Sequence, residues 1–200
     1  MLGLGVSHQP LVEARGADYG KPVATMRAYL DAYEAASYEP PAPAEPAPLI
    51  LAALGPRMLE LARDRSAGAH TYFVPVEHTR QARDVLGEGP LLAVEQGFVL
   101  DPDKERASDA ARDFASRYLA LPNYSNNLLR LGYCEEDVAG SGSERLIAET
   151  IVRGGAGDVA ARVSEHLAAG ADHVCLQPIA PALDLALAWL REVKPAVAGL

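Results

Sequence analysis

The sequence predicts an α/β protein built on a parallel sheet. Five short apolar segments with the character of strands alternate with segments of helical periodicity along the chain. Strict alternation of this kind is typical of parallel strands joined by right-handed crossovers. The clearest strand, residues 49–54, has no charged side chain, as expected for a strand covered on both faces. The length of 200 residues fits a single domain, 1–200, with a sizeable core.

The elements follow from local pattern, taken in chain order. Residues 2–6 are apolar and predict the first strand; Val23, Met26, Leu30 and Tyr33 recur at helical spacing and predict a helix over 19–36. Residues 38–48 hold five prolines and predict an extended connector. The later predicted strands are 49–54, 69–75, 91–100 and 173–177. The later predicted helices are 56–65, 77–86, 103–121, 143–153, 158–169 and 183–193, and 122–142 is irregular with a short helix over 126–131.

Two architectures fit this alternation, an open doubly wound sheet and part of a (β/α)8 barrel. In both, ligands bind at the carboxyl ends of the strands, so the residues that follow each strand are the candidates for a site.

Composition excludes several classes of function. The net charge is −9, and no basic stripe is present, which argues against nucleic acid as a partner. The apolar runs are too short to span a membrane, and the first residues lack the basic flank of a signal peptide. Cys134 and Cys175 form no C-x-x-C pair or zinc motif, so we expect reduced thiols in a cytoplasmic protein and no metal.

The junction after residues 49–54 is the strongest candidate for a binding site. Gly55 permits a tight turn, Pro56 suits the first helical position, and Arg57 lies in the first turn. Free backbone amides beside a guanidinium form a ready site for a phosphate group. This segment therefore predicts a phosphate-binding turn.

Other motifs have equally good structural explanations. Gly3 and Gly5 resemble the start of a dinucleotide fingerprint, but His8 stands where the third glycine is required, so a Rossmann site is disfavoured. Ser7 follows the first strand and either contacts a ligand or caps a turn. His78 and Arg80, at the start of a helix, either bind an anionic substrate or are solvated. The amides of residues 123–127 either line a pocket or cap helices, the second being favoured.

Five stretches in order resemble the bacterial luciferase-like superfamily, most closely its coenzyme F420-dependent oxidoreductase branch from actinobacteria. They are residues 48–62, Gly68-Ala-His-Thr-Tyr, Glu77-His-Thr-Arg-Gln-Ala-Arg, residues 121–132 and residues 168–177. The resemblance implies a (β/α)8 TIM-barrel fold in which this chain supplies strands four to eight and lacks roughly the first three βα units. It implies hydride transfer between F420 and an organic small-molecule substrate. FMN with a monooxygenase activity, or a non-catalytic flavin-binding remnant, are the alternatives.

Site residues carried over by the resemblance are few. Ser7 matches a hydroxyl that contacts the cofactor; the turn that approaches the phosphate-bearing tail is matched by Ala53, Leu54, Gly55 and Pro56, with Arg57 adjacent. His78 and Arg80 match a region that faces the substrate. The catalytic residues beside the reactive ring belong to the absent units and stay unknown.

The absent strands have a physical consequence. A barrel removes its sheet edges by closure, so a run of five strands leaves two open edges. We expect these edges to be covered by a homodimer or a rearrangement, unless the chain is a degenerate product or its start is misassigned.

Overall fold

The computed structural model describes residues 1–37, 39, 41 and 44–200. Residues 38, 40, 42 and 43 of the predicted proline-rich connector lie outside the described residues. The described strands form one parallel sheet: β1 (Leu2–Leu4), β2 (Leu49–Ala52), β3 (Gly68–Thr71), β4 (Leu91–Val99), β5 (Ile151–Arg153) and β6 (His173–Pro178). The predicted α/β class and the parallel sheet are confirmed.

Strand order follows chain order except for β5. The sheet runs β1-β2-β3-β4, and β6 pairs with β4. Ala93 and Val94 of β4 pair with both β3 and β6, so these two strands lie on opposite edges of β4. The short strand β5 pairs with Gly97–Val99 on the edge that β3 occupies further back. The five predicted strands therefore succeed one another without the reversal that defines a doubly wound sheet, which favours the barrel type.

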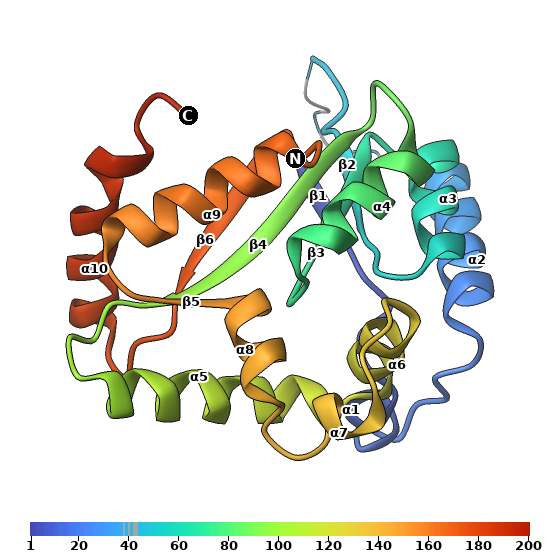
Figure 1. The fold of residues 1–200 in the computed structure, drawn as a ribbon. Helices are drawn as coiled ribbons and strands as arrows, with labels where there is room; N and C mark the ends of the chain where they lie inside the picture. Colours follow the sequence, from blue (N-terminus) through green and yellow to red (C-terminus); the bar gives the residue numbers. More distant parts are fainter. Residues whose placement is uncertain (38, 40, 42–43) are drawn as a thin grey trace.

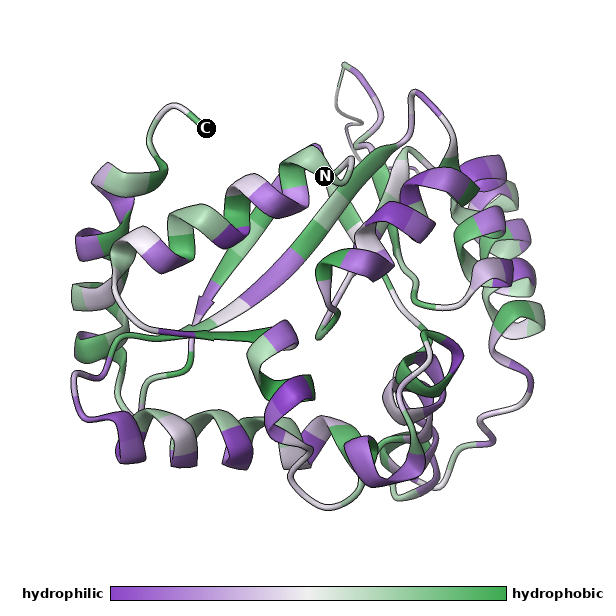
Figure 2. Ribbon diagram, in the orientation of Figure 1, coloured by the Kyte–Doolittle hydropathy of each residue, from purple (hydrophilic) through white to green (hydrophobic). Residues whose placement is uncertain are grey.

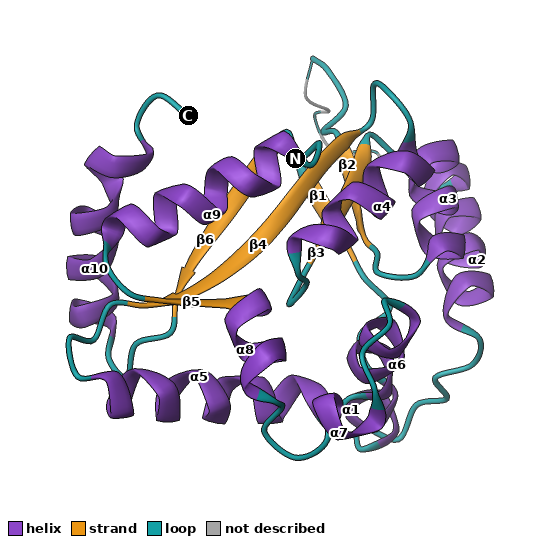
Figure 3. Ribbon diagram, in the orientation of Figure 1, coloured by secondary structure: helices purple, strands orange, loops and turns teal. Residues whose placement is uncertain are grey.

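The helices lie in two groups (Figures 1 and 3). The first group flanks the sheet: α2 (Pro22–Ala35), α3 (Pro56–Arg65), α4 (Val76–Leu86), α9 (Ala156–Ala168) and α10 (Leu183–Val197). The second lies toward the carboxyl ends of the strands: α1 (Gln9–Glu13), α5 (Lys104–Leu119), α6 (Pro122–Arg130), α7 (Glu135–Val138) and α8 (Glu144–Thr150). Within the described residues, no helix is long and apolar enough to cross a membrane.

The helix-covered face of the sheet is closely packed. Leu51, Ala69 and Leu92 are neighbours across β2, β3 and β4, and all three have no exposed surface. They share a core with Met26 and Leu30 of α2 and with side chains of α3 and α4. Replacing such a buried leucine by alanine costs about 2–5 kcal/mol, so this layer fixes the sheet.

The opposite face is partly open. The next residues in register are Ala52, His70, Ala93 and His173, which point to the other side because side chains alternate along a strand. Ala52 and His173 are exposed and His70 is half-buried. Within the described chain, β1 and β6 each pair with one strand, so the sheet is not closed. The expectation of a homodimer that covers these edges stays a prediction.

Two predicted segments differ from the structure. The helix expected over 143–153 ends at Thr150, and β-branched Ile151 and Val152 continue as β5, buried against β4. The region 122–142 is mostly helical, because Pro122 opens α6 nine residues long and Leu128 buries its apolar face. Helix α1 was not expected, and most strands end one to four residues earlier than predicted.

Strand β4 carries consecutive polar residues into the core, the purple stretch of an otherwise green strand in Figure 2. Gln96 is fully buried; its Oε1 accepts from His166 Nε2 at 3.0 Å, and its amide donates to the carbonyls of Gly97 and Thr150. Thr79 donates to His166 Nδ1 at 2.7 Å, which keeps the imidazole neutral. This network ties α4 and α9 to β4 in one arrangement.

Glu95 faces the other side, next to this network. Its Oε2 accepts from the Phe73 amide at 3.0 Å, while its Oε1 is buried with no partner among the described residues. Burial raises the pKa of the Glu95 carboxyl to about 7, and burial lowers the pKa of the His166 imidazole to about 4. Both groups therefore favour their neutral forms in the folded protein.

These two groups predict opposing pH effects on stability. Between about pH 6.5 and 4, His166 is protonated in the unfolded chain but stays neutral in the folded chain. Lowering the pH through this range therefore decreases the free energy of unfolding by roughly 3 kcal/mol in all. Between about pH 7 and 4.5, Glu95 is protonated in the folded chain but ionised in the unfolded chain. Lowering the pH through this range therefore increases the free energy of unfolding by roughly the same 3 kcal/mol. Urea unfolding from pH 7 to 5 should show His166→Gln gaining stability relative to wild type and Glu95→Gln losing it. Parallel profiles for all three proteins would contradict this assignment; His173→Gln, at an exposed site, is the control.

Candidate functional site

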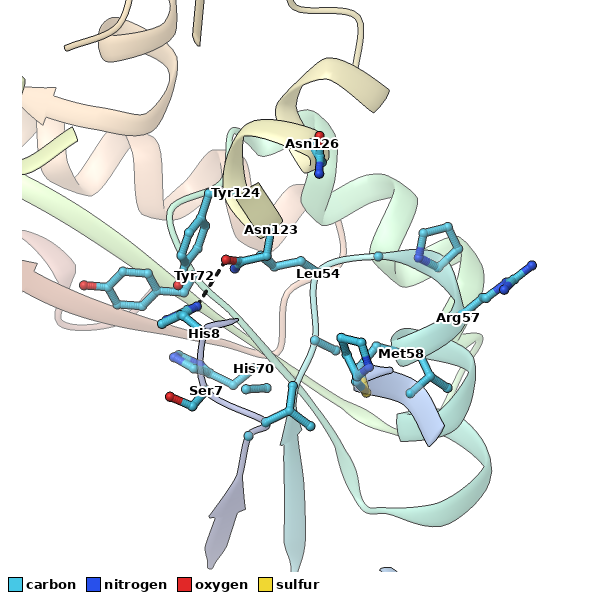
Figure 4. A pocket seen from close by; sticks show the side chains of 18 of the residues that line it. Ser7, His8, Leu54, Arg57, Met58, His70, Tyr72, Asn123, Tyr124 and Asn126 are labelled. Carbon is cyan, nitrogen blue, oxygen red and sulfur yellow. Dashed lines mark hydrogen bonds between the residues drawn. The ribbon is translucent and has the colours of Figure 1, made fainter. Parts of the chain in front are cut away.

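A cavity of about 840 Å³ opens at the carboxyl ends of β1, β2 and β3. Its walls come from the segments that follow these three strands, from the start of α2 and from α6 (Figure 4). Exposed Ala52 and half-buried His70, on the open face of the sheet, form part of the floor. The cavity lies where ligands of parallel α/β proteins bind, and its volume is within the range of small-molecule sites.

One end of the cavity is aromatic. His8 Nδ1 donates to Asn123 Oδ1 at 3.1 Å, which leaves Nε2 as an acceptor, and the imidazole lies 5.5 Å from the Tyr124 ring. The Tyr72 hydroxyl bonds to Gln177 Oε1 at 2.7 Å and to the Tyr118 hydroxyl at 2.8 Å. Figure 4 shows His8, Tyr72 and Tyr124 grouped on one side of the cavity. Burial raises the pKa of both tyrosines well above the usual range, so both keep their protons.

Two backbone turns beside this end are in the left-handed conformation. Ser7 has φ 62° and Phe73 has φ 52°, although neither is glycine. Such residues cost about 1–3 kcal/mol and cluster at functional sites. The Tyr19 hydroxyl donates to the Ser7 carbonyl, and Glu95 accepts from the Phe73 amide, so each turn is held by a side chain. Phe73 is buried among the rings of Phe114, Tyr118 and Tyr124, which fixes Tyr72 next to it.

The other end is built on the start of α3. Gly55 is the N-cap residue and makes no side-chain cap, and Pro56 opens the helix. The Arg57 amide lies in the first turn, where no carbonyl of the helix can accept from it. Arg57 and Met58 lie on this side of the cavity in Figure 4. Arg130 of α6 reaches the same place: a Cβ built on Gly55 would lie 3.3 Å from its Nη2.

His78 supports the Leu54–Gly55 turn through a hydrogen bond. Its Nε2 donates to the Leu54 carbonyl at 2.8 Å, and the side chain is 3% exposed. Burial lowers the pKa of His78, with the nearby Arg130 guanidinium adding to this effect, so the imidazole is neutral. His78 is thus a support of the Leu54–Gly55 turn and does not line the cavity.

The charge of the cavity is opposite to that of the protein. The chain carries a net charge of −9, yet among the described residues no Asp or Glu lines the cavity, and Arg57 and Arg130 do. Neither arginine forms an ion pair with another described side chain. A pocket with two uncompensated guanidinium groups favours an anionic ligand.

The residues predicted from the sequence are partly brought together. The cavity is lined by Ser7, Ala53, Leu54, Gly55, Pro56 and Arg57, all predicted as cofactor contacts. Arg80 is exposed and pairs with Glu77, away from the cavity lining, so its position gives no support to a substrate role.

Sequence reasoning missed His8 and Arg130 and left the amide cluster mainly to capping. Asn123 and Asn126 do line the cavity. The signal that could have found Arg130 was its place three residues after this amide cluster, at the end of the same helix.

No protein-family model matches the chain, and no curated protein matches it. Solved structures do. One is an F420-dependent secondary alcohol dehydrogenase in complex with an F420-acetone adduct, with a TM-score of 0.62 and 17% identity over 98% of this chain and 68% of that one. Another is the coenzyme F420 dependent tetrahydromethanopterin reductase from Methanopyrus kandleri, with a TM-score of 0.64 and 18% identity over 98% of this chain and 73% of that one.

A third structure is apo-MsnO8, with a TM-score of 0.53 and 17% identity over 88% of this chain and 59% of that one. At 17–18% sequence identity, the structural similarity to these three proteins shows a shared fold and nothing more. The parallel α/β fold matches that of luciferase-like barrels, so the resemblance predicted from the sequence is confirmed at the level of the fold. Each of the three chains is longer than the part this chain matches.

The His78 support predicts a measurable loss of stability. His78→Leu leaves the Leu54 carbonyl without its donor and should lower the free energy of unfolding by about 1–3 kcal/mol. His78→Gln keeps an amide donor of similar reach and should lose less. Urea denaturation at pH 7.5 measures both, and equal losses for the two variants would show that the hydrogen bond is unimportant.

Proposed function

We propose that this chain is a luciferase-like oxidoreductase that binds coenzyme F420 in the cavity and transfers a hydride between the deazaflavin and an organic substrate. Two F420-dependent proteins that share its fold support this proposal. The observation that carries it is the division of one cavity into an aromatic end and an acid-free cationic end.

This division fits the chemistry of F420. The cofactor has a flat ring system at one end and a phosphate-bearing, negatively charged tail at the other. A planar ring suits the surface formed by His8, Tyr72 and Tyr124, and a phosphate suits the start of α3 with its two arginines. Gly5 also matters: a Cβ there would lie 3.1 Å from the Ala52 Cβ, and a larger side chain would enter the cavity.

The residues that would hold the cofactor include those predicted from the sequence. Ser7 would contact the ring system, and the turn Ala53–Pro56 with Arg57 would hold the tail. FMN is the alternative occupant, because it too combines a ring with a phosphate. When bound, F420 supplies a carbon that accepts or donates the hydride.

The chain itself must handle the proton that accompanies the hydride. His8 lines the cavity and its Nδ1 is bound to Asn123, so its Nε2 can accept a proton from a substrate hydroxyl and return it to a carbonyl. Burial lowers the pKa of His70, so that ring is neutral and adds no positive charge at this end. The tyrosines keep their protons and shape the wall of the cavity.

Cofactor binding is tested by titrating the purified chain with F420 and, separately, with FMN, while following cofactor fluorescence. We expect saturable binding of F420 at micromolar concentrations and weaker binding of FMN. Gly5→Leu fills the cavity and should weaken F420 binding by about tenfold or more, since steric overlap costs at least 1–3 kcal/mol.

The matched control is Gly157→Leu, because Gly157 is exposed at the start of α9 and a Cβ there meets no atom within 4 Å. It should bind F420 like wild type. The absence of binding of both cofactors would reject the proposed function, and tighter binding of FMN would replace F420 with FMN.

A further inference from the structure

We infer that Arg130, anchored by Asn127, is the specificity residue that selects a phosphorylated cofactor, ahead of Arg57. This inference rests on the proposed function, because it identifies which side chain recognises the phosphate of the cofactor. It differs from the sequence-based prediction, in which Arg57 was the only arginine expected near the phosphate.

Arg130 lies directly at the start of α3. Its Nη2 is 3.3 Å and its Cζ 3.8 Å from the position of a Cβ on Gly55. Only the absence of a side chain at Gly55 leaves room for the guanidinium here without adjustment. The group therefore lies beside the first turn of a ten-residue helix, where the Arg57 amide has no backbone acceptor, and the amide and the guanidinium favour the same oxyanion.

Asn127 fixes the guanidinium in place. Its Oδ1 accepts from Arg130 Nη2 at 2.9 Å, and the asparagine is 3% exposed. Its Nδ2 has no partner among the described residues, but the residue is buried in α6 next to fully buried Leu128, so packing restricts the amide. An arginine held in advance loses less conformational entropy when it binds a ligand.

Arg57 lacks such an anchor. Both arginines are exposed, but no described side chain accepts a hydrogen bond from Arg57, which extends outward, away from His8 and Tyr72 (Figure 4). Within the described chain it forms no ion pair that would hold it toward the cavity. A free side chain of this length loses rotamer entropy on binding, which offsets much of its attraction.

The surroundings leave Arg130 as the decisive charge. No described acidic side chain lines the cavity to compensate it, and His78 on the other side of the turn is neutral. The described lining also includes Leu54, Gly55, Pro56, Met58 and Asn126, none of which carries a charge. An incoming phosphate thus meets the Arg130 guanidinium held by Asn127, the helix terminus and the Arg57 guanidinium, which has no such anchor.

The test compares F420 with the deazaflavin riboside that lacks the phosphate. Arg130→Ala should weaken F420 binding by about tenfold or more, since a charge-assisted bidentate contact is lost, and leave riboside binding unchanged. Arg57→Ala should weaken F420 binding by about threefold or less. Arg130→Lys keeps the charge without the planar fork and should fall between wild type and Arg130→Ala.

Arg80→Ala is the control, because it removes the same charge from an exposed residue outside the cavity lining. It should bind F420 like wild type at 150 mM salt. The inference is overturned if Arg130→Ala weakens the binding of F420 and of the riboside equally, or if it leaves F420 affinity unchanged. It is also overturned if Arg57→Ala weakens F420 binding more than Arg130→Ala does.

A chain that binds neither F420 nor the riboside would reject the proposed function instead. Calorimetric titration with inorganic phosphate then tests Arg130 directly. Binding by wild type that is lost in Arg130→Ala and kept in Arg57→Ala supports the inference. Equal phosphate binding by wild type and Arg130→Ala, or none by wild type, overturns it.

Discussion

The structure depends on how strand β4 buries two polar residues side by side. Glu95 and Gln96 point to opposite faces of the strand and both are buried, so their polar atoms depend on partners within the protein. Gln96 finds partners in His166 and in two backbone carbonyls, which locks the outer helices to the sheet. Glu95 finds the Phe73 amide, which fixes the turn that ends β3. One strand thereby couples the stability of the outer layer to the geometry of the cavity.

Each end of the cavity is supported by a buried side chain that lies outside the lining. At the aromatic end, Glu95 holds Phe73 in its left-handed conformation and so sets the position of Tyr72. At the cationic end, His78 holds the Leu54 carbonyl and so sets the direction of the Gly55 turn. Neither support lines the cavity. A substitution at either would therefore alter binding through backbone geometry, without removing a contact to the ligand.

The sequence predicted what local pattern determines. The helix at Pro56–Arg65 and the parallel strands follow from periodicity and turn residues, and Gly55, Pro56 and Arg57 do line one cavity. The predictions that failed concern features that depend on tertiary contacts. Ile151–Arg153 becomes a strand only because the end of β4 offers an edge, and His78 is a support because the chain brings Leu54 to it. The pairing of Arg130 with Gly55 joins residues far apart in sequence, which no local pattern reveals.

Electrostatics explains how this cavity can attract an anion although the protein is acidic. The net charge of −9 repels anions at long range, but screening limits that field to about 8–10 Å at physiological salt. Inside the cavity the nearest fixed charges are Arg57 and Arg130, with no described acidic side chain in the lining. Attraction over a few ångströms outweighs the screened repulsion of distant carboxylates. The acidic surface then acts against nonspecific association with polyanions such as nucleic acid.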